Sequence, residues 1–194
     1  LGRRLLTADD DVTVEDPGEY QMKGFNQVNI RADVGLSFTA SLRSILRQDP
    51  DVIMIGEVRD SETLDIAVKA ALTGHLVVSS LHTTTAAGSI TRMVNMGVEP
   101  FLIVSSLICI AAQRLLRRVC PKCKELYEVT RMVYDRLLIG KIVPDKDFKF
   151  YKGKGCPHCF NTGYSGRVGI TDILALKPRA KEMILTEAGE IELK

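Results

Sequence analysis

Four of the five cysteines in the chain form two Cys-x-x-Cys pairs. Cys120 and Cys123 make the first pair, Cys156 and Cys159 make the second, and 32 residues separate them. Each short turn directs two sulfurs toward one ion, and four thiolates are the number that tetrahedral Zn²⁺ takes. The spacing therefore predicts a structural zinc site. Two unrelated pairs, redox-active or free, are the alternative.

One histidine and the fifth cysteine lie near these pairs. His158 stands between Cys156 and Cys159, where binding the metal in place of a cysteine would strain the turn. Cys109 lies in an apolar run that predicts a buried helix, so we expect it to belong to the core.

Acidic residues follow two apolar runs that predict strands. Glu15 and Asp16 follow residues 12–14, and Glu57 follows residues 52–55. Ligands of parallel α/β sheets bind at the carboxyl ends of the strands. Two carboxylates there can hold Mg²⁺ and orient an attacking water. An acid in this place is also a common helix cap or turn residue, so the hypothesis depends on the pair.

His82 follows a third predicted strand, residues 76–80, and is expected at the same edge of the sheet. A hydrogen-bonded structural histidine is the alternative. His75 precedes that strand, so we expect it far from the edge.

Three arginines are candidates for stabilising phosphate. Arg43 and Arg47 are four residues apart on one predicted helix, and Arg59 follows Glu57. Arginines near a nucleotide can stabilise the transferred phosphate, from the same subunit or a neighbouring one. Spacing alone favours a solvated or salt-bridged face, for instance Arg59 with Glu62.

The elements that must position these residues alternate between strand and helix. Continuous apolar strands alternating with helices indicate a parallel α/β sheet covered by helices. This pattern ends near Val119, which predicts an α/β domain over 1–119 and a metal-tied subdomain over 120–194. Residues 20–30 predict a loose hairpin, and the predicted helices are 37–48, 61–72, 86–96, 100–118, 130–138 and 179–185.

Composition excludes several classes of protein. The chain has 194 residues, 45% of them hydrophobic, which is sufficient for a sizeable core. A formal net charge of +2 does not indicate a nucleic-acid or membrane partner. No apolar run approaches the roughly 20 residues that cross a bilayer, and the N-terminus lacks the features of a signal peptide. The phosphate-binding loop Gly-x-x-x-x-Gly-Lys-Ser/Thr does not occur.

These motifs together resemble the secretion-superfamily ATPases, in particular the class that powers type II secretion and type IV pilus extension. Residues 12–21 (VTVEDPGEYQ) resemble the aspartate box of that family and residues 42–60 (LRSILRQDPDVIMIGEVRD) its Walker B region. Residues 74–83 (GHLVVSSLHT) resemble its histidine box. The four cysteines followed by residues 162–169 (TGYSGRVG) are typical of assembly and secretion ATPases rather than retraction ATPases.

The resemblance implies part of a RecA-like core with helices on both faces of its parallel sheet. It also implies a homo-hexameric ring that hydrolyses Mg·ATP and binds no nucleic acid. Such a ring would lie in the cytoplasm, coupled to an inner-membrane platform protein. Cargo is recognised elsewhere in these machines, so the resemblance covers secretion, pilus assembly and DNA uptake alike.

The resemblance also implies roles for the candidate residues. Glu15 would polarise the attacking water, Glu57 would help to hold Mg²⁺, and His82 would sense the γ-phosphate. The four cysteines would bind zinc. The arginines expected around the site or a subunit interface are Arg43, Arg47 and Arg59.

The chain departs from the family pattern in a few places. Gly18 replaces a branched apolar residue, Thr84 and Thr85 replace Asn-Asp, and Asp172 lies near a position that usually holds glutamate. The family's phosphate loop is expected about two dozen residues before Glu15. We therefore expect a C-terminal fragment that hydrolyses ATP poorly on its own. A zinc-stapled interaction module without catalysis is the alternative function.

Overall fold

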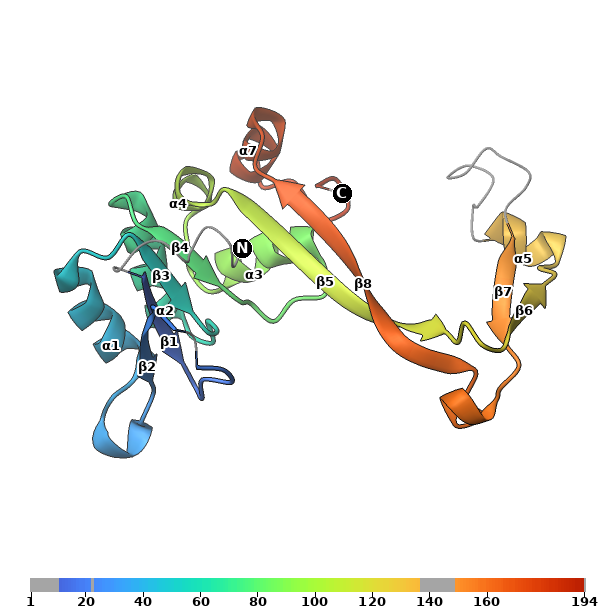
Figure 1. The fold of residues 1–194 in the computed structure, drawn as a ribbon. Helices are drawn as coiled ribbons and strands as arrows, with labels where there is room; N and C mark the ends of the chain where they lie inside the picture. Colours follow the sequence, from blue (N-terminus) through green and yellow to red (C-terminus); the bar gives the residue numbers. More distant parts are fainter. Residues whose placement is uncertain (1–10, 22, 137–148, 194) are drawn as a thin grey trace. The chain divides into compact units, whose positions relative to one another are not determined.

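The computed structural model describes residues 11–21, 23–136 and 149–193 (Figure 1). The chain divides into two compact units. The first contains the chain up to Ala112 together with Asp172 onward, and the second contains Gln113–Thr171. The sequence pattern instead predicts one subdomain over 120–194. The grouping differs because the chain returns to the first unit after Thr171, where α7 (Pro178–Leu185) and the residues around it join its core.

A four-stranded parallel sheet forms the centre of the first unit. This confirms the predicted α/β fold class. The hairpin predicted over 20–30 is wrong, because the second strand of the sheet pairs in parallel with the first. Parallel pairing requires the chain to cross back between strands, which a hairpin turn cannot do. The strands, in spatial order, are β2 (Asn26–Asn29), β1 (Asp11–Glu15), β3 (Val52–Ile55) and β4 (Leu76–Ser79).

Three predicted helices begin at residues whose side chains cap them. Ser37, Asp60 and Thr85 each accept a hydrogen bond from a backbone N–H in the first helical turn. Such caps satisfy donors that have no partner within the helix. None of the helices among the described residues is long and apolar enough to span a membrane. The helices of the first unit that precede Ala112 are α1 (Phe38–Ile45), α2 (Ser61–Leu72), α3 (Ala86–Asn95) and α4 (Pro100–Ser106).

The core of the first unit joins one face of the sheet to the helices. Val12 and Val14 lie beside Ile53 and Ile55 in the register of β1 and β3, and all four side chains are buried. Helix residues complete the same apolar cluster. The fully buried members from helices are Leu42 of α1 and Ile103 of α4.

The helix predicted over 100–118 is wrong beyond its first two turns. α4 ends at Ser106, and residues Cys109–Val119 form strand β5. β5 pairs with β8 (Tyr164–Ala175), so its backbone hydrogen bonds come from a partner about fifty residues further along the chain. The prediction that Cys109 belongs to the core is also wrong, since its side chain is exposed.

The second unit contains a second, short antiparallel pair. β6 (Lys124–Tyr127) pairs with β7 (Phe150–Gly153), and helix α5 (Arg131–Arg136) follows β6. The prediction of a helix over 130–138 is confirmed up to Arg136, and the remaining two residues lie outside the described part of the chain. A short 3₁₀ turn at Pro157–Cys159 leads into β8.

Candidate active site and metal centre

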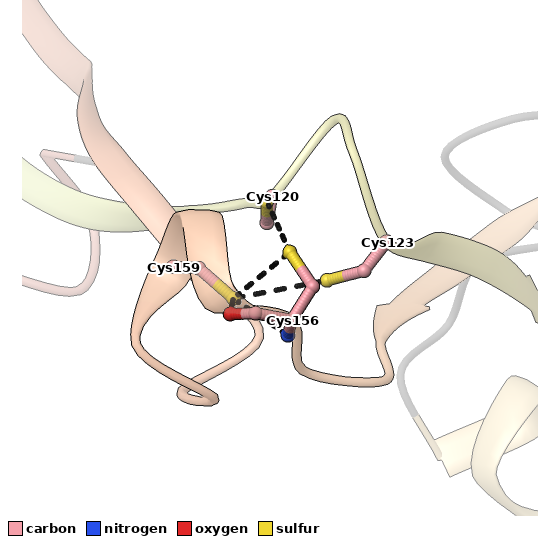
Figure 2. Close-up of side chains that lie close together, drawn as sticks. All are labelled: Cys120, Cys123, Cys156 and Cys159. Atoms are coloured by element: carbon pink, nitrogen blue, oxygen red, sulfur yellow. Dashed lines mark hydrogen bonds between the residues drawn. The ribbon is translucent and has the colours of Figure 1, made fainter.

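The four cysteines of the two Cys-x-x-Cys pairs converge in the second unit, as Figure 2 shows. Their sulfurs all lie within 4.8 Å of one another. Cys156 Sγ lies 3.7 Å from Cys159 Sγ and 4.0 Å from Cys120 Sγ, and Cys123 Sγ lies 3.8 Å from Cys159 Sγ. A tetrahedral ion with bonds of about 2.3 Å to sulfur requires sulfurs about 3.8 Å apart. The spacing therefore fits one four-coordinate metal ion.

Backbone groups around Cys159 favour its thiolate form. Burial raises the pKa of this thiol, but N–H groups of Cys156 and Gly163, each 3.3 Å from Sγ, and the neighbouring thiols lower it to about 6. Burial raises the pKa of Cys123 to about 12 without a metal. These two backbone N–H groups would also orient Cys159 Sγ and stabilise its negative charge when it binds a metal ion. His158 is exposed and does not belong to the group.

A cavity of about 400 Å³ lies at the carboxyl edge of the parallel sheet in the first unit. Glu15 ends β1, Glu57 follows β3, and His82 follows β4, so three neighbouring strands deliver the three predicted residues to it. The cavity is lined by Glu15, Asp16, Pro17, Glu19, Tyr20, Met54, Gly56, Glu57, Ser80 and His82.

Glu57 is held by two cationic or proton-bearing partners. Arg59 forms an ion pair with Oε1, and His82 Nε2 lies 2.9 Å from Oε2. The hydrogen bond from Arg59, and then that from His82, hold the pKa of the Glu57 carboxyl below its usual range. The side chain of Glu57 is only 15% exposed, whereas that of His82 is 82% exposed. His82 is therefore accessible from solvent and also touches the carboxylate.

Glu15 is held instead by neutral donors. Thr13 Oγ1 donates to Glu15 Oε1 at 2.8 Å, and Gln27 Nε2 donates to the same oxygen at 3.2 Å. Glu15 and Glu57 thus share one cavity but differ in the charge of their partners.

The remaining predicted residues lie elsewhere. Arg43 forms an ion pair with Glu62 at 3.0 Å, so the expectation that Glu62 pairs with Arg59 is wrong. Arg43 and Arg47 are both exposed and do not line the cavity. His75 lies before β4, where its Nδ1 is 3.1 Å from the carbonyl oxygen of Ala70.

The sequence did not identify several residues of the site. Thr13 and Gln27 are strand residues, and the contact of Gln27 with Glu15 depends on the pairing of β1 with β2. The contact of Thr13 with Glu15 could have been predicted from their spacing, because residues two apart on a strand share a face. Tyr20 lines the cavity from the segment for which the sequence predicts a hairpin.

The chain matches the family model described as "Type II/IV secretion system protein" over residues 3–194. The chain belongs to this family. Its place in the type II/IV secretion system family agrees with the resemblance carried by the aspartate, Walker B and histidine boxes.

Relatives in the type II/IV secretion system family are named as ATPases. The type IV pilus assembly ATPase PilB of Myxococcus xanthus is 50% identical over 184 residues, which cover 94% of this chain and 32% of that protein. The type II secretion system ATPase E of Vibrio cholerae is 48% identical over 182 residues, covering 92% of this chain and 35% of that protein. The chain thus spans about a third of the length of these relatives.

A solved structure in the comparison has the same fold. The pilus retraction motor PilT with bound ADP matches with a TM-score of 0.64 at 29% identity, over 91% of this chain and 41% of that one. The likeness supports the α/β fold of the first unit.

Proposed function

We propose that the chain is part of an ATP-hydrolysing motor subunit that powers type II secretion or type IV pilus assembly. The observation that carries the proposal is the cavity at the carboxyl edge of the sheet, where Glu15, Glu57 and His82 meet. Relatives over most of this chain are ATPases of both machines, which supports the same reaction class. The whole protein would act in the cytoplasm as a homo-hexamer coupled to an inner-membrane platform protein.

The two carboxylates in the cavity suit the magnesium ion of Mg·ATP. Carboxylate oxygens are the ligands that Mg²⁺ prefers, and Mg²⁺ supplies charge neutralisation at the β- and γ-phosphates when it is bound. Glu57 would help to hold the ion, and Glu15 would polarise the attacking water. His82 lies beside Glu57 and is mostly exposed, and it would donate a hydrogen bond to the γ-phosphate. Arg59 would balance the charge of Glu57.

The four-cysteine group would hold zinc. Four sulfurs at tetrahedral spacing, with two backbone donors on Cys159, match a closed structural site rather than a catalytic one, which keeps a position open for water. The ion would therefore stabilise the second unit and take no part in hydrolysis.

Two substitutions in the full-length protein test the division of labour in the cavity. Glu15→Gln should bind Mg·ATP normally and lose at least about tenfold in turnover, about 1.4 kcal/mol of transition-state stabilisation, because orienting water matters mainly in the transition state. Glu57→Gln should lose turnover and also show an altered Mg²⁺ requirement. ATPase rates across a Mg²⁺ titration, together with calorimetric ATP binding, measure both effects.

The outcomes separate the roles clearly. Full turnover in Glu15→Gln would remove it as the residue that polarises water. The reverse pattern between the two variants would exchange their roles. Wild-type turnover in both variants would mean that neither carboxylate is needed for hydrolysis, and a full-length protein without ATP turnover would leave the interaction-module function as the better account.

A further inference from the structure

The two oxygens of the Glu15 carboxylate have different surroundings. Oε1 accepts both hydrogen bonds, from Thr13 Oγ1 at 2.8 Å and from Gln27 Nε2 at 3.2 Å. Within the described part of the chain, Oε2 accepts none. A Cβ placed on Gly18 would lie 3.6 Å from Oε2, so this second oxygen lies beside the turn whose residues Pro17 and Glu19 line the cavity.

The donors are fixed by the strands that carry them. Thr13 lies two residues before Glu15 on β1, so both side chains project from the same face of the sheet. Gln27 is the register partner of Thr13 on β2. Parallel pairing thus sets both donors beside one carboxylate without help from a flexible loop.

Thr13 is unusual for its position. It is fully buried in an inner strand, and its neighbours Val12 and Val14 pack into the apolar core. A valine would suit such a strand at least as well, since β-branched apolar side chains favour buried strands. A buried hydroxyl needs a partner, and this one donates to Glu15.

Gln27 ties the carboxylate to the cavity wall. The same amide nitrogen that donates to Glu15 also donates to the carbonyl oxygen of Tyr20, at 2.9 Å. Tyr20 lines the cavity. Gln27 therefore couples the orientation of Glu15 to the position of the turn.

We propose that Thr13 and Gln27 are positioning residues that hold Oε1 of Glu15 and leave Oε2 as the oxygen that meets the attacking water. The inference rests on the proposed function, in which Glu15 polarises that water. A carboxylate anchored through one oxygen must break both hydrogen bonds before it can rotate and exchange its two oxygens. The lone pairs of Oε2 therefore keep a fixed direction, which is what a water molecule held in position for attack requires.

Thr13 offers a matched pair of variants for the test. Thr13→Val keeps the branched shape and removes the hydroxyl, whereas Thr13→Ser keeps the hydroxyl. In the full-length protein we expect Thr13→Val to lower kcat about tenfold with the KM for ATP changed less than about twofold, because orientation acts in the transition state. Thr13→Ser should retain at least roughly half of the wild-type kcat. Equal kcat for Thr13→Val and wild type would overturn the inference.

Gln27→Leu tests the second donor, with Gln48→Leu as its control. Gln48 lies on an exposed 3₁₀ turn away from the cavity. Gln27→Leu should lower kcat and also raise KM, because it frees the Tyr20 turn. Gln48→Leu should leave both constants unchanged. Equal constants for Gln27→Leu and Gln48→Leu would contradict the role of Gln27.

A double-mutant cycle separates positioning from a general effect on the fold. If Thr13 acts through Glu15, adding Thr13→Val to Glu15→Gln should reduce turnover no further. An additional tenfold loss in the double variant would show an action independent of Glu15 and would overturn the inference. Full turnover in Glu15→Gln itself would refute instead the water-polarising role that the proposed function gives to Glu15, so the two failures are distinguishable.

Discussion

Single residues in the cavity differ in the charges that surround them. Glu57 is paired with Arg59 and touches His82, and its pKa is lowered as a result. A carboxylate whose folded-state pKa is lowered contributes stability above its unfolded pKa. That contribution is lost as the pH falls through the lower, folded-state pKa. Glu57 therefore keeps its charge in mildly acidic solution.

Removing Arg59 should raise the pKa of Glu57. We expect Arg59→Gln to move the protonation of Glu57 to higher pH, toward the ordinary range of a glutamate, because the largest lowering contact is lost. NMR titration of the Glu57 side-chain carboxyl carbon in the nucleotide-free protein measures this. Arg92→Gln, which removes an exposed arginine from α3, serves as the control and should leave the titration unchanged. An unshifted Glu57 titration in Arg59→Gln would show that Arg59 does not set this pKa.

The cysteines provide a second prediction at this scale. Purified protein should contain about one equivalent of zinc, and Cys159→Ser should lose most of it, because a hydroxyl is a poor substitute for the best-supported thiolate. Cys109→Ser is the matched control, since Cys109 is exposed and outside the group. Elemental analysis by mass spectrometry measures both. Equal zinc in the two variants would contradict the four-cysteine site.

At the scale of elements, the start of α3 carries more support than the other helix starts. Thr85 Oγ1 accepts from the Gly88 N–H at 3.0 Å and donates to Glu190 at 2.6 Å. Asp172 accepts from the Ala86 N–H at 3.2 Å. Carboxylates at a helix N-terminus also interact favourably with the helix dipole. The C-terminal part of the chain thus fixes the helix that follows His82.

Loss of the Thr85 cap should lower the free energy of unfolding. We expect Thr85→Ala to lower the free energy of unfolding by about 1 kcal/mol, and Thr85→Ser to lower it much less because the serine hydroxyl can still cap the helix. Chemical denaturation followed by circular dichroism compares the two. Similar losses in both variants would mean that the threonine methyl group, rather than its oxygen, stabilises this helix start.

Elements were predictable where local pattern decides them. α1, α2 and α3 each combine an apolar face with a capping residue, and β3 is a short apolar run between Pro50 and Gly56. β5 was predicted as helix because its pairing with β8 is remote in sequence. The contact of Gln27 with Glu15 could not be predicted for the same reason, because it depends on which strands pair. The site residues that end strands were predictable, and their supporting neighbours were not.

At the scale of the whole molecule, the chain contains two units with separate sources of stability. The first has an apolar core shared by a sheet and helices. The second lacks a comparable core: in its described part the buried hydrophobic residues are Cys120 and Cys159, both members of the metal-binding group. Small units with little core often depend on a metal for folding.

Metal removal should therefore unfold one unit and spare the other. After chelation we expect hydrogen exchange to accelerate in β6, β7 and the loops that carry the cysteines, while β1 and β3 keep their protection. Mass spectrometry of exchange at the peptide level resolves these segments. A parallel loss of protection in β1 and β3 would show that the two units unfold together.

The pairing of β5 with β8 has a consequence for chain length. Leu176 donates its N–H to Ile108 near one end of the pair, and Cys120 donates to Gly163 near the other, so the strands run antiparallel. For the first unit, Gln113–Thr171 is an inserted loop, and its two ends belong to the paired strands β5 and β8. The entropy of closing such a loop grows only with the logarithm of its length, so ten added residues cost on the order of 0.1 kcal/mol. A Gly/Ser insertion between Tyr127 and Phe150 should leave the melting temperature of the first unit unchanged, and a marked fall would show that loop length matters there.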